Sequence, residues 1–360
     1  MEVAGAEFLD APARSAVDGN LSSLVHLQHL HIRYVRGLCR ATLPCLQLLT
    51  CLNVNGLSIE NLLQLGALTS LQELHLRTSL EDAVGPSSAP GLVFPASLTK
   101  LVLWSDVEAG LLSLVTGLHE LRVESGDIKG PAEGSGSLLC GMARLQHLTD
   151  LYLGGSELTW PPAGATYSAL TASSNLVRMV LYNTFVAEGA WQHVFAGTRR
   201  LPHLTSLELS YYDRDGDWDA SPYWDAADLS SLVSCCPSLC SIHTLPLRPG
   251  LHVSALHKLT ALTQLYVDYD TWRYDRTRFI DSVRGLAAVA QLRSLHVTMF
   301  IPTMHAATLL PLTSLTALTN FYFSQCSQAS WNMSTEVNTG GGSIHVGGMW
   351  LGTCERIASP

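Results

Sequence analysis

The sequence is poor in charge, above all in positive charge. Only 14% of its 360 residues are charged, Lys accounts for 3 of the 21 basic residues, and the formal net charge is -9. A chain this acidic does not attract nucleic-acid phosphate or an anionic membrane through its overall charge. We therefore expect neither nucleic acid nor a membrane among its partners.

Long apolar runs are also missing. No stretch reaches the roughly 18 uninterrupted apolar residues that a membrane-spanning helix needs. The start of the chain carries Glu2, Glu7, Asp10 and Asp18 without an apolar segment, so it does not resemble a secretory signal. These absences favour a soluble protein of the cytoplasm.

Recognisable catalytic and metal-binding motifs are absent as well. The nine Cys have no spacing typical of a disulfide framework or a zinc ribbon. The sequence has no phosphate-binding loop, no dinucleotide-binding glycine motif, no zinc-protease helix motif and no nucleophile elbow. We expect buried thiols, no cofactor and no enzymatic activity.

What the sequence does contain is Leu, 62 residues of it, in a repeating register. The pattern L-x-x-L-x-L, with other residues replacing some of the Leu, occurs twelve times at intervals of 20 to 35 residues. Its copies are Leu27/Leu30/Ile32, Leu49/Leu52/Val54, Leu71/Leu74/Leu76, Leu98/Leu101/Leu103, Leu118/Leu121/Val123, Leu148/Leu151/Leu153, Leu176/Met179/Leu181, Leu204/Leu207/Leu209, Leu239/Ile242/Thr244, Leu262/Leu265/Val267, Leu292/Leu295/Val297 and Leu318/Phe321/Phe323.

Segments such as Leu68–Leu76 and Leu259–Val267 resemble the leucine-rich-repeat superfamily. The resemblance implies an α/β solenoid, a right-handed horseshoe of about twelve repeats with a concave parallel sheet and helices or turns on the convex side. Period-2 alternation agrees, because it puts the pattern residues on one face of each strand and the residues between them on the other. No single repeat buries its own apolar side, so the core must continue from repeat to repeat.

The repeats depart from the family pattern in the turn after each strand. The position where the family places Asn holds residues such as Val35, Leu57 and Tyr212. We expect degenerate repeats of the intracellular kind, with turns held by water and local bonds.

The pattern divides the chain into three parts. They are a short N-terminal segment, 1–23, the repeat domain, 24–331, and a Gly-rich tail, 332–360, which we expect to be loose. Helical periodicity is expected in the longer return segments, 59–65, 188–196, 225–235 and 278–290.

Two local motifs invite a metal interpretation that their details disfavour. Asp213–Asp219 is rich in carboxylates, but Trp218 and Trp224 stand where a calcium-binding EF-hand needs Gly and a bidentate carboxylate. We favour a solvated loop whose aromatic residues pack on the solenoid edge or on a partner. Cys235, Cys236 and Cys240 are favoured as core thiols at a helix end.

A third candidate emerges when the strands are stacked about 4.8 Å apart. One outward row then holds His29, Cys51 and Glu73, and the next holds His31, Asn53 and His75. Imidazole, thiol and carboxylate groups suit zinc. Two interpretations stay open: zinc shared by His29, His31, Cys51 and His75, and the favoured one, a polar surface without metal.

The outward strand positions also concentrate Tyr, with seven of the 11 in the chain. Strand propensity explains part of this enrichment, but Tyr on a solvated sheet is also typical of protein recognition. The later repeats are acidic there, so a partner with Arg, Lys and apolar groups fits. The predicted partner-binding residues are Trp104, Tyr152, Tyr182, Glu208, Tyr211, Tyr266, Asp268, Tyr269 and Tyr322.

We interpret the chain as a non-catalytic scaffold or adaptor that binds a protein on its concave face. Two alternatives stay open. One is a regulator of an enzyme, either an inhibitor or a GTPase activator of the leucine-rich-repeat type. The other is an adaptor on the cytoskeleton or the ciliary axoneme.

Overall fold

The computed structural model describes residues 2–3, 23–32, 43–55, 63–77, 93–104, 112–124, 138–155, 157–158, 164–182, 184–186, 189–196, 199–210, 224–247, 253–269, 276–299, 306–325, 334–339 and 342–347. The chain divides into two compact units. The first comprises Met1–Leu204 with Ser210–Asp213, and the second comprises Thr205–Leu209 with Arg214–Pro360.

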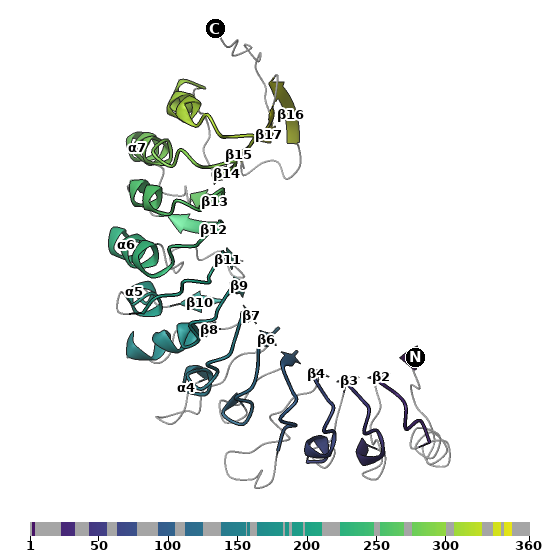
Figure 1. Ribbon diagram of the computed structural model, residues 1–360. Coiled ribbons are helices and arrows are strands. Elements are labelled where there is room, and N and C mark those ends of the chain that lie inside the picture. The colour runs from purple at the N-terminus through teal and green to yellow at the C-terminus, as the bar shows by residue number, and fades with distance from the viewer. Residues whose placement is uncertain are drawn as a thin grey trace. The chain divides into compact units, whose positions relative to one another are not determined.

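The first unit is built on a parallel sheet whose neighbours follow the chain order (Figure 1). Its strands are β1 (Glu2–Val3), β2 (His29–Ile32), β3 (Cys51–Asn55), β4 (Glu73–Arg77), β5 (Lys100–Leu103), β6 (Glu120–Val123), β7 (Asp150–Gly154) and β9 (Arg178–Tyr182). Each consecutive pair in this order is parallel. Two short strands, β8 (Glu157–Leu158) and β10 (Phe185–Val186), pair separately.

The second unit repeats the arrangement. Its strands are β11 (Ser206–Ser210), β12 (Ser241–Leu247), β13 (Gln264–Tyr269), β14 (Ser294–Met299), β15 (Asn320–Gln325), β16 (Ser334–Thr339) and β17 (Gly342–Gly347). From β11 to β15 each neighbouring pair is parallel and runs in chain order. All twelve copies of the Leu pattern therefore form strands of a leucine-rich-repeat solenoid.

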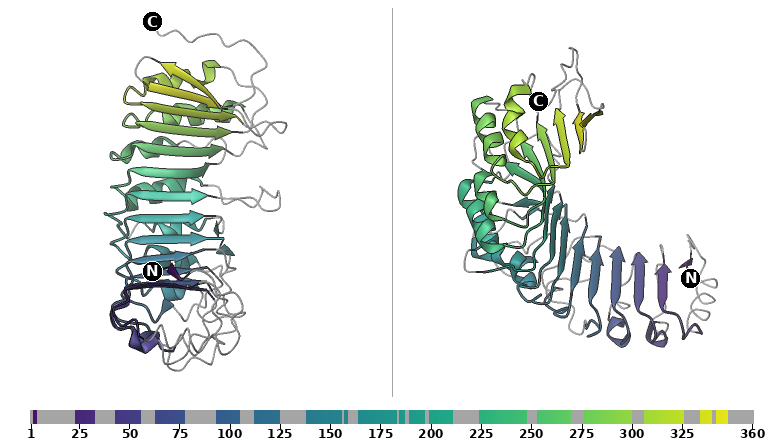
Figure 2. Two further views of the ribbon diagram at one scale, coloured as in Figure 1. Left: turned by 90° about the vertical axis from the view of Figure 1, so that its right-hand side faces the viewer. Right: turned by 45° about the horizontal axis from the view of Figure 1, so that its top comes forward.

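Short helices return the chain on one side of the strands in each unit (Figure 2). The first unit has η1 (Leu43–Cys45), η2 (Leu65–Ala67), α4 (Leu138–Met142), η3 (Gly164–Thr171) and α5 (Trp191–Val194). The second has α6 (Ala226–Cys235), η5 (Val253–Lys258), α7 (Arg276–Leu286) and η6 (Ala306–Ser314). Helix is thus confirmed within 188–196, 225–235 and 278–290. No helix among the described residues combines the length and apolar character needed to cross a membrane.

The start of α6 shows how local sequence fixes a helix boundary. The Asp225 carboxylate accepts a hydrogen bond from the Asp228 backbone N–H at 2.8 Å, and the Asp228 carboxylate accepts one from the Asp225 backbone N–H at 3.0 Å. This reciprocal capping box satisfies two backbone donors that the first helical turn leaves open. Trp224, directly before it, is fully buried, so this member of the aromatic loop packs within the chain.

The core lies between the strands and the return segments. The middle residue of every pattern copy is buried, and Leu151 and Leu265 are 1% and 2% exposed. In β3 and β4 buried and partly exposed residues alternate along the strand. The intervening residues therefore lie on the face of the sheet opposite the helices. This is the face that the sequence analysis predicts to be concave, and we call it the outer face of each unit.

Threonine side chains bind the preceding repeat at the entry to several strands. The Thr hydroxyl donates to the main-chain carbonyl at the equivalent position of the preceding repeat, which also accepts two backbone N–H groups. The bonds are Thr50 to Gln28, Thr99 to Gln72, Thr149 to His119, Thr263 to Cys240 and Thr319 to Arg293. A ladder of threonines thus ties successive repeats together where the Leu-Thr sequence recurs.

One strand departs from the predicted register. In β12 the pairing with β13 shifts between Ile242 and Leu245, and Thr244 has a φ of 56°. Leu245 is fully buried and occupies the core position that the pattern gave to Thr244. That assignment of Thr244 is wrong, because a β-bulge inserts an extra residue and places a non-glycine residue in the left-handed region.

The composition predicts a loose tail over 332–360, whereas the structure has two strands within it. β17 pairs parallel with β15 and antiparallel with β16. The residues Ser343, Ile344, His345 and Val346 alternate polar and apolar in the sequence, as a strand requires.

Candidate functional site

A connected set of aromatic and charged side chains covers the outer face of the first unit. The Arg77 guanidinium carbon lies 4.3 Å from the Trp104 ring centroid. The Trp104 indole N–H donates to the Glu124 carboxylate at 2.6 Å. Glu124 forms an ion pair with Arg122, whose guanidinium carbon lies 4.2 Å from the Tyr152 ring centroid. We call Arg77, Trp104, Glu124, Arg122 and Tyr152 the aromatic network.

The sheet register and one glycine position this network. Leu76, Leu103 and Val123 pair across β4, β5 and β6, so the residues that follow them lie side by side. A Cβ atom on Gly154 would lie 2.9 Å from Cε1 of the Tyr152 ring, so Gly at this position leaves room for that ring. The outward Val102 is only 2% exposed, as expected for a small residue between longer neighbours.

The network consists mainly of Arg, Trp and Tyr side chains. Trp, Tyr and Arg are the residues that most often carry the affinity of protein interfaces. Cation–π contacts and a charge-assisted hydrogen bond hold the rings in place, which lowers the ordering cost of binding.

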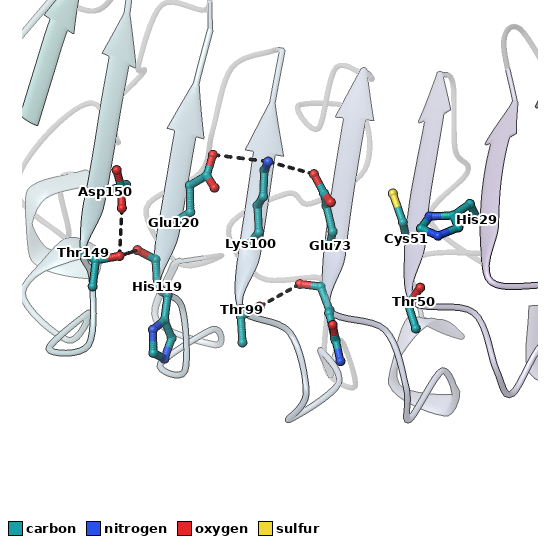
Figure 3. A pocket seen from close by; sticks show the side chains of 11 residues that line it. His29, Thr50, Cys51, Glu73, Thr99, Lys100, His119, Glu120, Thr149 and Asp150 are labelled. Carbon is teal, nitrogen blue, oxygen red and sulfur yellow. Dashed lines mark hydrogen bonds and ion pairs between the residues drawn. The ribbon is translucent and has the colours of Figure 1, made fainter. Parts of the chain in front are cut away.

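An open polar depression of about 320 Å³ lies on the same unit (Figure 3). Lys100 lies at its centre, with its Nζ atom 2.9 Å from Oε1 of Glu73 and 3.4 Å from Oε1 of Glu120. The hydrogen bond to Glu73 raises the pKa of Lys100 above its ordinary value. Burial would raise the pKa of Glu73, but hydrogen bonds from Lys100 and His75 hold it below its usual range. Both groups are therefore charged at neutral pH.

Cys51 and Glu73, which line the depression, lie close to His75, so three ligand groups of different chemical type come together. Single ligand atoms of Cys51, Glu73 and His75 all lie within 4.8 Å of one another. The group differs from the predicted set, because His29 and His31 are outside it and Glu73 is inside it. The register explains the absence of His31, since it pairs with Asn53, which in turn pairs with His75.

The outer face of the second unit carries a row of Tyr and His. Tyr266 pairs with His296, and His296 pairs with Tyr322. The His296 ring centroid is 4.1 Å from that of Tyr266, edge to face, and 5.7 Å from that of Tyr322. The Tyr266 hydroxyl is 2.7 Å from Oγ1 of Thr298. These contacts hold the two tyrosines in fixed orientations while each remains partly exposed.

Burial, and next the charge of His243, lower the pKa of His296 from its ordinary value to about 4. In an unfolded chain His titrates near 6.5, so between about pH 6.5 and 4 the unfolded chain binds more protons than the folded one. We therefore expect the stability of the second unit to be greatest above pH 6.5 and to fall as the pH drops toward 4. Urea unfolding at a series of pH values measures this, and His296→Gln should flatten the dependence. An equal slope in the variant and the wild type would contradict the assignment to His296.

The structure describes the side chains of six of the nine predicted partner-binding residues. Trp104, Tyr152, Tyr182, Tyr266 and Tyr322 lie on the outer faces, with Tyr182 39% exposed. Glu208 is partly exposed and pairs with His243. Only the backbone of Asp268 and Tyr269 is described, in β13, and Tyr211 lies outside the described residues. The prediction did not select Arg77, Arg122, Glu124 and His296, although extension of the strand register places them beside the selected aromatic residues.

The structure describes one of the two motifs for which a metal interpretation was disfavoured, the cysteine motif, and not the other. Cys235 and Cys236 are fully buried at the end of α6, as expected for core thiols, whereas Cys240 is partly exposed. A hydrogen bond with Cys235, followed by burial, raises the pKa of the Cys236 thiol. The carboxylate-rich segment Asp213–Asp219 lies outside the described residues.

The fold of this chain is similar to solved structures that include leucine-rich-repeat proteins. An internalin from Listeria monocytogenes is 14% identical, with a TM-score of 0.47, and the match covers 89% of this chain and 90% of the internalin. A leucine-rich-repeat protein from Leptospira interrogans is 12% identical, with a TM-score of 0.43 and coverage of 86% and 81%. TLR13, solved in a complex with ssRNA13, is 14% identical, with a TM-score of 0.44, and covers 91% of this chain but 55% of TLR13.

No family model matches the sequence. No curated protein matches it either. The fold assignment therefore rests on the twelve registered strands of the chain itself.

Proposed function

We propose that this protein is a non-catalytic interaction scaffold that binds a protein partner on the outer face of its repeats. The aromatic network is the observation that carries the proposal. It combines one Trp, one Tyr and two Arg on adjacent strands, oriented by contacts with one another. A rigid surface of this composition gains affinity by burying its rings against a second protein.

The charge of this face supports a protein partner over a polyanion. Acidic and basic side chains alternate across β4 to β6, as in the Glu73–Lys100–Glu120 ion pairs. Such a surface offers no continuous run of positive charge for a phosphate backbone, while it can fix the register of a partner with complementary charges. The proposal places the protein in the cytoplasm.

Trp104→Ala tests the proposal, with His193→Ala on the exposed side of α5 as the control. Affinity purification with mass spectrometry first identifies proteins that the wild type and the control retain and the variant loses. Calorimetry with the purified partner should then show about a tenfold or greater loss of affinity for Trp104→Ala, because the indole is the largest ring of the network. Equal affinities for both variants, with unchanged circular dichroism, would refute a role for this surface.

A further inference from the structure

We infer that Cys51, Glu73 and His75 form a binding site for a zinc-like divalent cation on the outer face of the first unit. This inference goes beyond the proposed function and does not depend on it. The three side chains come from two adjacent strands, with Cys51 of β3 paired directly to Glu73 of β4 and His75 two residues further along β4. Period-2 alternation puts Glu73 and His75 on the same face.

The distances fit a site that closes with small side-chain rotations. The three ligand atoms lie within 4.8 Å of one another, and the His75 Nε2 atom is 2.6 Å from Oε1 of Glu73. Protein ligands of tetrahedral zinc lie about 2.0–2.3 Å from the ion and therefore roughly 3.5 Å from each other. All three residues are partly exposed, so an ion reaches them from solvent and water can fill the fourth position.

The chemistry of the donors selects the class of ion. A thiolate with an imidazole favours zinc, cobalt and similar ions over magnesium or calcium, which prefer oxygen ligands. The His75 Nδ1 atom is buried and has no hydrogen-bond partner among the described residues. Nε2, the ring nitrogen next to Glu73, is therefore the atom that an ion shared with Glu73 would bind.

Lys100 is the group that opposes the ion. Its ammonium group forms an ion pair with the Glu73 carboxylate in the ion-free protein, and its positive charge repels an incoming cation. It also reaches Glu120, so it can release Glu73 and keep a counter-ion. Burial, and next the charge of Glu73, raise the pKa of the Cys51 thiol, so binding an ion releases the thiol proton to solvent.

Cobalt(II) provides the test, because a thiolate ligand gives it a charge-transfer absorption in the near ultraviolet. The full chain, purified without an affinity tag and titrated with cobalt, should develop this absorption, and added zinc should abolish it. Cys51→Ser should remove the absorption, whereas Cys45→Ser, which changes an exposed thiol outside the group, should leave it intact. Absence of the band in the wild type, or its persistence in Cys51→Ser, would overturn the inference.

Two further variants separate ligation from a structural effect. His75→Gln should weaken zinc binding, measured by competition with a chromophoric chelator, by roughly tenfold or more, while His31→Gln leaves it unchanged. Lys100→Gln should tighten zinc binding roughly three- to tenfold, because it removes a competing positive charge. Loss of binding in Lys100→Gln, with circular dichroism unchanged, would count against the site.

Discussion

Replacing Leu151 with Ala should lower the free energy of unfolding of the first unit by about 2–5 kcal/mol. Leu151 is 1% exposed in β7 and lies in register between Leu121 and Met179. Truncation there removes apolar burial and leaves a cavity that rigid neighbouring repeats fill only in part. Urea unfolding followed by circular dichroism measures the loss.

The matched control is Leu114→Ala, the same chemical change at a side chain that is 47% exposed. We expect it to cost less than about 1 kcal/mol, because little buried surface is lost. Leu265→Ala and Leu310→Ala form the corresponding pair in the second unit, at 2% and 54% exposure. Equal costs within a pair would mean that the burial pattern of that unit is wrong.

The repeat fold was predictable because it depends on a local and redundant pattern. Period-2 alternation alone assigns Leu52 and Val54 to the core and Cys51 and Asn53 to the outer face, and twelve copies enforce the same answer. The neighbours across strands follow from stacking the copies. That is how Cys51 and Glu73 could be placed in one row before the structure was known.

Local irregularities escaped prediction because they depend on competition between adjacent residues. In β12 either Thr244 or Leu245 could take the core position, and burial of the larger apolar side chain outweighs the strain of a positive φ at Thr244. The threonine ladder had a visible sequence signal in the repeated Leu-Thr pair. Its meaning depends on where the preceding carbonyl points, which sequence does not specify.

The sequence predicts which face of the sheet carries the residues of the candidate site, but it does not predict which of their side chains contact one another. Extending the register puts Arg77, Trp104 and Glu124 beside one another, yet side-chain rotamers decide that Arg77 stacks on the indole and that Glu124 accepts from it. The same applies to His75, whose ring lies 5.5 Å from the Trp104 ring. The inferred ion site and the aromatic network are therefore in contact, so occupancy of one should change the environment of the other.

In the second unit, Tyr266→Ala combined with Tyr322→Ala should weaken partner binding about thirtyfold or more. Both rings lie on the outer face on either side of His296, where they contact its imidazole but stay partly exposed. They are denied full burial within the chain, so they gain it only when a partner covers them.

Further variants distinguish the contribution of the Tyr rings to binding from that of their hydroxyl groups and from effects on folding. Tyr266→Phe keeps the ring but loses the hydroxyl contact with Thr298, so it should show an intermediate loss of affinity. Gln192→Ala with Arg284→Ala, both exposed on the helical side, is the matched double control and should bind as the wild type does. Calorimetry gives the affinities, and thermal melting checks that all variants stay folded. Undiminished binding by the folded Tyr266→Ala/Tyr322→Ala protein would mean that strand propensity alone explains why Tyr is enriched in these strands. The aromatic network of the first unit would then remain as the proposed binding surface.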